Sequence, residues 1–193
     1  MLEFGCIPHP KYSFLGASPD GITPNGVMLE IKVPYSREFQ KDDIPPHYYD
    51  QMQGQLEVCN LDECDFLQCK IEELNGLVEY LEENEAQFKG VVLEYKDSNN
   101  NIAFFYSKLN ITEKEMEKWI RGIKINLSSK GLCLKNTWYW KLIKFTIDNV
   151  KRESGWKEKS LPIFTKFWKE VVYYRENMDE LKNNKRKKIV LDI

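Results

Sequence analysis

Several features typical of other protein classes are missing from this sequence of 193 residues. No apolar run approaches the roughly 18 residues that a membrane-spanning helix needs, so no membrane partner is expected. The opening residues lack the basic and apolar segments of a secretory signal peptide, and we therefore expect an intracellular protein of the cytoplasm or nucleus. The length allows one catalytic domain, and 42% hydrophobic with 30% charged residues is typical of a globular protein.

The chain has no Cys-x-x-Cys pair and only two histidines, His9 and His47. Both facts argue against a structural zinc site. Five cysteines are an odd number without dense spacing, which argues against a disulfide framework and indicates reduced thiols. Cys59, Cys64 and Cys69 recur every five residues, but they fall in or beside an expected helix and an expected strand. We interpret these three as core residues.

Charge is unevenly distributed although the net formal charge is only −2. Residues 1–107 carry 7 basic and 19 acidic side chains, whereas residues 108–193 carry 21 basic and 11 acidic ones. The acidic half can concentrate metal ions, and the basic half can bind a phosphate backbone through counterion release. For any single lysine, a solvated surface position is the simpler interpretation.

The stretch 19–32 carries the strongest functional signal. Residues 27–33 alternate in the manner of a β-strand. Alternation would put Glu30 and Lys32 on one face, with Cα atoms roughly 6–7 Å apart, and would send the intervening apolar residues to the core. Turn dipeptides, Asp-Gly at residue 20 and Asn-Gly at residue 25, predict a tight reversal that brings this strand back alongside Asp20.

This set of side chains suits phosphodiester hydrolysis. Asp20 and Glu30 would hold Mg²⁺, for which Mn²⁺ can substitute, and the backbone carbonyl of Ile31 is a candidate third ligand. A metal there would polarise a phosphoryl oxygen and lower the pKa of a bound water. Lys32 would orient that water and offset charge in the transition state. The alternative interpretation is an ordinary exposed strand face with a Glu–Lys pair.

Three motifs occur in order: Ser-Pro-Asp-Gly at residues 18–21, Leu-Glu-Ile-Lys-Val-Pro at 29–34 and Tyr-Tyr-Asp-Gln-Met-Gln at 48–53. Together they resemble the motif set of the lambda exonuclease family, also called YqaJ-type viral recombinases, within the PD-(D/E)XK nucleases. The resemblance covers about residues 3–72. It implies an α/β (α+β) fold with a restriction-endonuclease-like core, in which helices flank a mixed β-sheet. It also implies a magnesium-dependent deoxyribonuclease, which in the best-known members is a 5′ to 3′ exonuclease acting on double-stranded DNA ends.

The resemblance also implies roles for individual residues. Asp20 and Glu30 would be metal ligands, Lys32 the catalytic lysine, and Gln51 a catalytic glutamine on the helix that borders the site. Three further polar residues of these segments are expected to contact DNA: Ser18, Tyr48 and Gln55. The residues themselves support this helix, because two prolines at 45–46 are a start signal and an apolar stripe follows at Met52, Leu56 and Cys59.

One part of the family pattern is not matched. In the family, an upstream helix supplies a glutamate that completes the metal site, and the same region binds the 5′-phosphate. Residues 2–5 match the stretch just after that helix, so Glu3 is not expected to be the missing acid. Three explanations stay open: a truncated longer enzyme, a helix supplied by another polypeptide, or an impaired nuclease.

The remaining sequence predicts further regular structure and a basic end. We expect strands at 65–71, 90–95, 102–106 and 138–147, a helix capped by Thr112 and Glu115, and a last helix from Leu161. Leu77 to Gln87 is ambiguous. Aromatic and basic residues near residue 140 suit either core packing, which we favour, or stacking on unpaired bases; they are Trp138, Tyr139, Trp140, Lys141 and Lys144. A disordered tail that grips phosphate is expected from Lys182, Lys185, Arg186, Lys187 and Lys188, a composition shared with nuclear-localisation signals.

The expected domain organisation is a nuclease core at 1–110, an extension at 111–181 that completes it, and the tail at 182–193. Three functions stay open: a magnesium-dependent exonuclease on DNA ends in recombination, repair or viral DNA processing, a catalytically weak DNA-binding module with the same fold, and a site-specific endonuclease. The expected partners are double-stranded DNA ends, a single-strand annealing protein and further copies of the chain.

Overall fold

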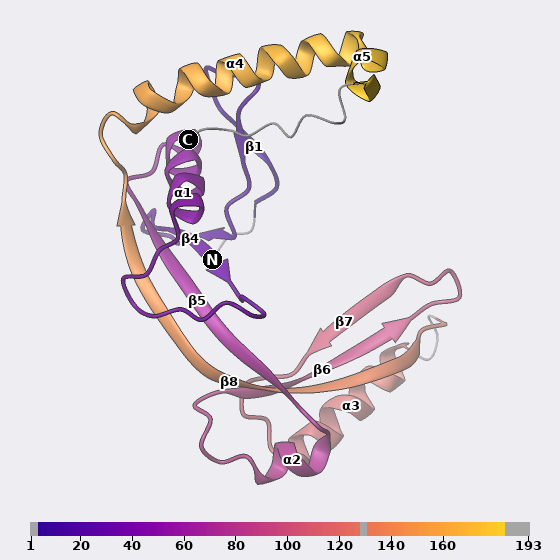
Figure 1. Ribbon diagram of the computed structural model, residues 1–193. Coiled ribbons are helices and arrows are strands. Elements are labelled where there is room, and N and C mark those ends of the chain that lie inside the picture. Colours follow the sequence, from indigo (N-terminus) through magenta and orange to yellow (C-terminus); the bar gives the residue numbers. More distant parts are fainter. Residues whose placement is uncertain (1–3, 128–130, 184–193) are drawn as a thin grey trace. The chain divides into compact units, whose positions relative to one another are not determined.

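The computed structural model describes residues 4–127 and 131–183, with side chains as far as residue 180. It is a mixed α+β fold in which helices flank β-structure (Figure 1). In chain order the elements are β1 (Ile7–Pro8), β2 (Gly16–Ala17), β3 (Gly21–Ile22), β4 (Met28–Lys32), α1 (Pro46–Cys59), β5 (Glu63–Leu74), α2 (Leu77–Glu82), β6 (Lys89–Lys96), β7 (Ile102–Tyr106), α3 (Glu113–Leu127), β8 (Cys133–Lys151), α4 (Trp156–Glu176) and α5 (Met178–Asn183).

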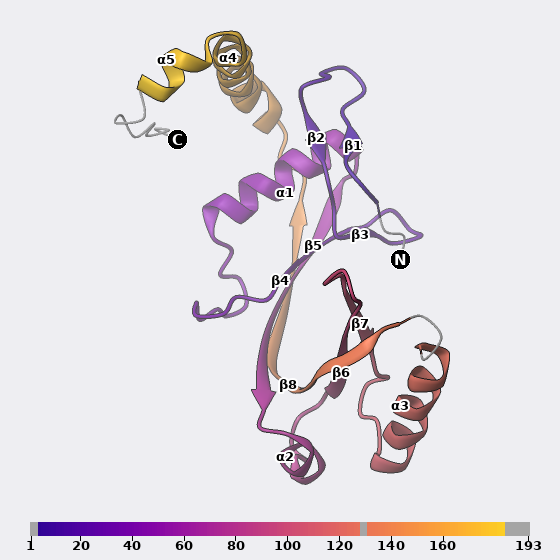
Figure 2. The ribbon, with the colours of Figure 1, turned by 90° about the vertical axis from the view of Figure 1, so that its right-hand side faces the viewer.

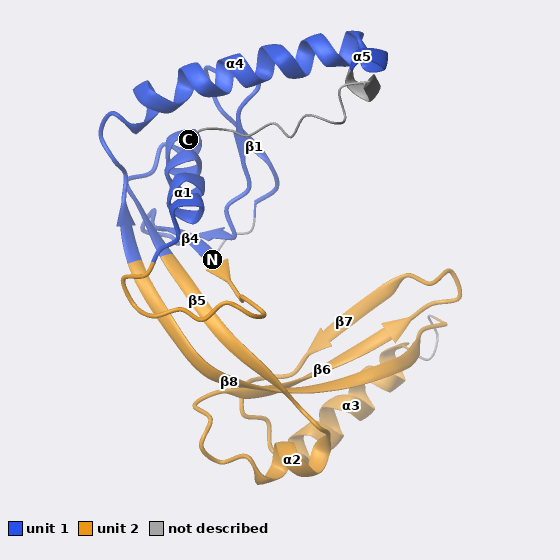
Figure 3. Cartoon of the chain, viewed as in Figure 1, with its two compact units in different colours: residues 1–30, 44–65, 149–193 blue, residues 31–43, 66–148 orange. Residues whose placement is uncertain are grey.

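Six strands form one sheet in the order β3-β4-β5-β8-β6-β7, and β1 pairs with β2 in a separate antiparallel ribbon. By its contacts the chain divides into two compact units, residues 1–30, 44–65 and 149–193 in unit 1 and residues 31–43 and 66–148 in unit 2 (Figure 3). Strands β4, β5 and β8 contribute residues to both units. The boundary of the catalytic core at residue 110, which was predicted from the sequence, stays a prediction. No helix in the described ranges has the length and apolar character to cross a membrane.

Helix α1 is the central helix of unit 1. Pro45 precedes its first turn, and Asn60 ends it in the left-handed conformation with φ of 53°. Met52 and Leu56 are fully buried, and α1 contacts β1, β2 and α4. Burial of this stripe is the main stabilisation of the helix, because propensity alone does not hold a helix of this length in water. The helix predicted from the two prolines and the apolar stripe is confirmed.

A tight hairpin joins β3 to β4 in unit 1. The register pairs Gly21 with Leu29 and Ile22 with Met28. The Thr23 N–H donates to the carbonyl of Val27 at 2.9 Å, and Gly26 adopts φ of 84°, which a residue with a Cβ rarely adopts. The reversal predicted from the Asn-Gly dipeptide is confirmed.

Unit 2 is built on three antiparallel strands, β7, β6 and β8. Helices α2 and α3 cover one face of these strands (Figure 2). That face carries the core of the unit, which includes Tyr80, Val91, Leu93, Tyr95 and Met116. The predicted cap of α3 is present, since the Thr112 N–H and hydroxyl both donate to Glu115 Oε2, at 3.1 and 2.7 Å.

Two predictions about the later part of the chain are corrected. The last long helix begins at Trp156 and not at Leu161, so that Pro162 lies inside α4. Pro162 removes one intrahelical N–H, but the turn before it is anchored because Trp156 is buried and donates to Asp50. Strand β8 extends well beyond the predicted 138–147. Of the predicted tail, Lys182 falls within α5, whereas Lys185, Arg186, Lys187 and Lys188 lie outside the described residues.

Candidate active site

Asp20 and Glu30 flank the paired part of the β3–β4 hairpin. The last registered pair is Gly21 with Leu29; Asp20 directly precedes β3, and Glu30 follows Leu29 on β4. Side chains directly opposite each other in an antiparallel pair project from the same face, with Cβ atoms about 4.5–5.5 Å apart. Continuing the register by one residue would set Asp20 opposite Glu30, and the approach of these two acids to a common ion stays a prediction.

Glu30 is a buried carboxylate that α1 holds in place. Its exposed fraction is 2%. Gln51 Nε2 donates to Oε1 at 2.8 Å, and Gln55 Nε2 donates to Oε2 at 3.0 Å. Two amide donors, one on each oxygen, offset part of the cost of removing a carboxylate from water and fix its orientation.

The packing of β4 differs from the prediction. The apolar residues Leu29 and Ile31 were expected to face the core, but both are only half-buried, whereas Met28 and Glu30 are buried. The reason is that α1 covers the face that carries Glu30, and its glutamine side chains hydrogen-bond to the carboxylate. Glu30 therefore lies at a helix–strand interface and not on an exposed strand face.

Cys64 lies near the start of β5 in a negatively charged environment. Burial is the main cause that raises the pKa of its thiol to about 12, together with the negative charges of Glu30, Asp65 and Asp20 and against a hydrogen bond from the Glu30 backbone. Cys64 is fully buried, as expected for a core residue, while Cys59 is half-buried.

Ile31 and Lys32 complete β4 directly after Glu30. Lys32 is half-buried, and strand alternation gives it the same face as Glu30. The predicted ligand atom of Ile31 is its backbone carbonyl. Their parts in metal binding and catalysis stay predictions.

The three residues predicted to contact DNA differ in how far they are exposed to solvent. Gln55 is buried, and its Nε2 also donates to the Ser18 carbonyl at 3.4 Å, so the structure gives Gln55 a positioning role for Glu30. Ser18 has an exposed side chain, and Tyr48 is half-buried one helical turn before Gln51. Direct contact of these three with DNA stays a prediction.

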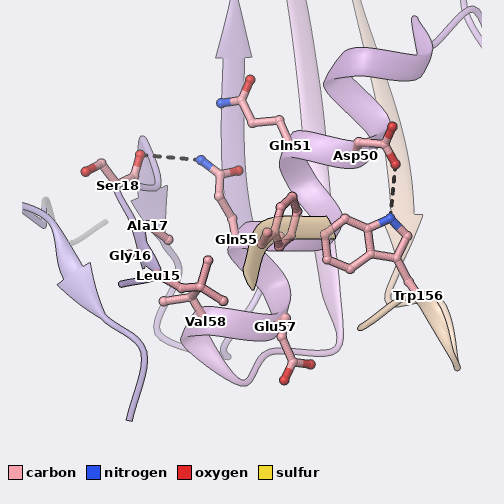
Figure 4. A pocket seen from close by; sticks show the side chains of 12 residues that line it. Leu15, Gly16, Ala17, Ser18, Asp50, Gln51, Gln55, Glu57, Val58 and Trp156 are labelled. Atoms are coloured by element: carbon pink, nitrogen blue, oxygen red, sulfur yellow. Dashed lines mark hydrogen bonds between the residues drawn. The ribbon is translucent and has the colours of Figure 1, made fainter. Parts of the chain in front are cut away.

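A cavity of about 400 Å³ adjoins this cluster inside unit 1. Figure 4 shows Gln55 between Ser18 and the indole of Trp156, with the amide nitrogen turned toward Ser18. The amide oxygen of Gln55 is buried and has no hydrogen-bond partner within the described part of the chain. Phe164 contributes a second aromatic wall. The volume of the cavity is within the roughly 300–1,000 Å³ range of ligand-binding pockets.

Sequence reasoning missed the wall of this cavity. Trp156 Nε1 donates to Asp50 Oδ1 at 3.0 Å, which fixes the ring beside α1 (Figure 4). Residues 50 and 156 are far apart in the chain, and neither is part of a periodic pattern that pairs them. Asp50 does lie inside the third motif, and this was the one feature of the sequence that could have pointed to its place beside the site.

The donor set fits a hard cation. Carboxylate oxygens are the ligands that Mg²⁺ prefers, and the pair Asp20 and Glu30 supplies them from adjoining strands. Across residues 4–127 and 131–183, no group of three or more His, Cys, Asp and Glu side chains is placed to hold a metal. Any third protein ligand from the described residues would therefore be a different kind of group, such as a backbone carbonyl.

Comparison with known proteins agrees with the motifs. Residues 2–62 match the family model of the YqaJ-like viral recombinase domain. The predicted resemblance to YqaJ-type viral recombinases is thereby confirmed for residues 2–62, and this YqaJ-like segment contains the β3–β4 hairpin and α1. The chain is also 33% identical over 222 residues to the uncharacterized protein R354 of Acanthamoeba polyphaga mimivirus. That alignment covers 93% of this chain but only 40% of the length of R354.

Proposed function

We propose that this chain is a metal-dependent deoxyribonuclease whose YqaJ-like segment holds the catalytic groups. The observation that carries the proposal is the buried Glu30 carboxylate oriented by two glutamines, on a hairpin whose register, continued by one residue, would set Asp20 opposite it. A buried, oriented carboxylate beside a second acid is an arrangement suited to binding a divalent cation. The proposal includes a PD-(D/E)XK core as the fold of this segment.

Asp20, Glu30 and the carbonyl of Ile31 would hold Mg²⁺ or Mn²⁺. The ion supplies Lewis-acid stabilisation of the phosphate and lowers the pKa of a bound water. Gln51 and Gln55 keep the Glu30 carboxylate in one orientation, so that little reorganisation is needed when substrate arrives. Lys32 lies two residues after Glu30, and its positive charge would stabilise the negative charge that develops on the phosphate oxygens in the transition state.

The proposed substrate is double-stranded DNA, degraded from its ends during recombination, repair or viral DNA processing. The support is the family match and the viral origin of the relative R354. Cooperation with a single-strand annealing protein and assembly of several copies belong to the same proposal. The excess of lysine and arginine after residue 107 favours a polyanionic partner.

A second candidate is a DNA-binding module of the same fold with weak catalysis. The observation that favours it is that no group of three or more His, Cys, Asp and Glu side chains in the described part of the chain is placed to hold a metal. A site-specific endonuclease is a third candidate, and circular DNA distinguishes it from an enzyme that needs an end.

The test is a cleavage assay on linear duplex DNA that carries a label at either the 5′ or the 3′ end. We expect degradation with Mg²⁺, none with a chelator, and at least about a 100-fold loss in Asp20→Asn, Glu30→Gln and Lys32→Ala. Circular duplex DNA should stay intact. The matched control is Glu38→Gln, which removes a surface acid that pairs with Lys70 and Lys144.

The outcomes separate the candidates. Equal inertness of the wild type and all variants, with DNA binding retained, supports the binding module and overturns the nuclease. Linearisation of circular DNA supports the endonuclease. Cleavage by the Glu30→Gln variant at the wild-type rate overturns the assignment of the site.

A further inference from the structure

One face of the three-stranded part of unit 2 is covered by α2 and α3, and the opposite face carries exposed aromatic rings. Along β7 the side chains of Phe104 and Tyr106 are 50% and 71% exposed, while Phe105 between them packs against the core. Along β8 Trp138 is 38% exposed, while the following Tyr139 packs against the core. Strand alternation thus sorts these residues into a core face and an open face.

The register aligns the aromatic residues of the open face across the central strand β6. Tyr106 and Trp138 both pair with Val92, so the three form one row across β7, β6 and β8. Neighbouring strands are about 4.8 Å apart, which places Tyr106 and Trp138 roughly 10 Å from each other. Trp140, two residues after Trp138, pairs with Gly90 on the same face.

Both tryptophans are held over β6. A Cβ on residue 90 would lie 2.7 to 2.9 Å from three atoms of the Trp140 indole, so this ring lies over the glycine backbone and only glycine leaves room for it. Trp138 Nε1 donates to Glu94 Oε2 at 3.1 Å. The rings are thus oriented before any partner arrives, which lowers the entropy cost of binding.

Polar and basic groups surround these rings. Asn136 Nδ2 donates to Glu94 Oε2 at 2.7 Å, and hydrogen bonds from Asn136 and Trp138 lower the pKa of Glu94. Lys96 on β6 and Lys135 on β8 belong to the same two strands, and their positive charges lower this pKa further. The open face therefore combines flat rings, hydrogen-bonding groups and two lysines.

We infer that the open face of β6, β7 and β8 is a binding surface for single-stranded nucleic acid, with unpaired bases stacked on Tyr106, Trp138 and Trp140. Every base has a π-face, so stacking on aromatic rings tolerates any sequence. Lys96 and Lys135 would neutralise phosphates, and Asn136 and Glu94 are suited to the polar edges of bases. The surface includes none of the acids of the candidate active site, and its role does not depend on cleavage.

The experiment uses the full chain in a chelating buffer, in which no metal-dependent cleavage takes place. Fluorescence anisotropy measures the binding of labelled 20-nucleotide oligo(dT) and oligo(U), and a duplex of the same length serves as competitor. Tyr106→Ala and Trp138→Ala should each weaken binding of the single strand about 5- to 100-fold. Tyr106→Phe and Trp138→Phe keep a ring and should bind within about threefold of the wild type.

The matched control is Phe145→Ala. Phe145 is also on β8 and 42% exposed, but it lies beyond the part paired with β6 and an odd number of residues from both tryptophans. Its loss should leave binding unchanged. Thermal unfolding of each variant identifies any that fail to fold, and Tyr106 is so exposed that its truncation is not expected to unfold the unit.

The ratio of oligo(dT) to oligo(U) affinity decides between DNA and RNA as the strand bound. Wild-type affinity in both alanine variants overturns the proposal, and so does an equal loss in Phe145→Ala. If the wild type does not bind single strands, the proposal is also overturned, and a protein becomes the alternative ligand of the open face. An inactive nuclease that still binds oligo(dT) through these rings would refute the proposed cleavage and leave this inference standing.

Discussion

Gln51 Nε2 donates a hydrogen bond of 2.8 Å to Glu30 Oε1 and thereby links α1 to the central strand of the proposed site. Gln55 makes the corresponding bond to Oε2, so the two carboxylate oxygens are held by residues one helical turn apart. The polar side chains of Gln51 and Gln55 on α1 are thus used to hold the Glu30 carboxylate.

Truncation of either glutamine should lower cleavage without abolishing it. A hydrogen bond to a charged group contributes about 1.5–3 kcal/mol, so we expect Gln51→Ala and Gln55→Ala each to reduce kcat/KM by about 10- to 100-fold. Single-turnover rates on linear duplex DNA measure the effect. Gln53→Ala is the control, because Gln53 is buried on α1 like Gln55 but bonds the backbone of residues 151 and 153. Equal losses of rate in all three variants would contradict a specific role for the Glu30 bonds.

Metal binding should be measurable without turnover. At a Mn²⁺ concentration 100 times Kd, a single site stabilises the folded state by about 2.7 kcal/mol, which raises Tm by roughly 5–10 °C for a chain of this size. A chelator should reverse the shift. The shift should disappear in Glu30→Gln and persist in Glu38→Gln. A shift of the same size in both variants would show that the ion binds elsewhere.

Acid should destabilise unit 1 through Glu57. Burial opposes ionisation of this carboxyl, but hydrogen bonds from Lys157 and Arg152 outweigh it and hold the pKa of Glu57 below its ordinary value of 4.5. A carboxyl with a lowered pKa contributes stability that is fully present above about pH 4.5 and is lost as the pH falls through the folded-state pKa.

Urea unfolding at pH 7 and at pH 3.5 tests this contribution. Glu57→Gln should destabilise the protein by about 2 kcal/mol at pH 7, because it leaves two cations short of their partner. The variant should also lose less stability than the wild type between the two pH values. Identical pH dependence in the two proteins would show that Glu57 is not the group responsible.

Gly90 should be intolerant of a side chain because of Trp140. Gly90→Ala would bring a methyl group to within 2.7 Å of the indole, and displacing the ring should cost about 1–3 kcal/mol. In a Trp140→Leu background the same change should cost clearly less. A double-mutant cycle by urea unfolding measures the coupling, and additive effects would rule out the contact.

Local features allowed much of the fold to be predicted. The Asn-Gly turn, the alternation in β4, the double proline before α1 and the cap of α3 depend on neighbours within a few residues, so their sequence patterns were sufficient. Helix α4 shows where such reasoning ends. Its first turn is anchored by the contact of Trp156 with Asp50, and a contact over that sequence separation leaves no periodic signal.

The sequence by itself determined the spacing of Asp20, Glu30 and Lys32 and the turn that reverses the chain between the two acids, because backbone geometry within one hairpin follows from local residue types. The tertiary structure alone decided that Glu30 is buried under α1, since helix placement depends on packing between distant segments. It also decided which aromatic residues of β8 enter the core, because that depends on the face that α2 and α3 cover. Local chain geometry is encoded in short segments, whereas burial is a property of the assembled fold.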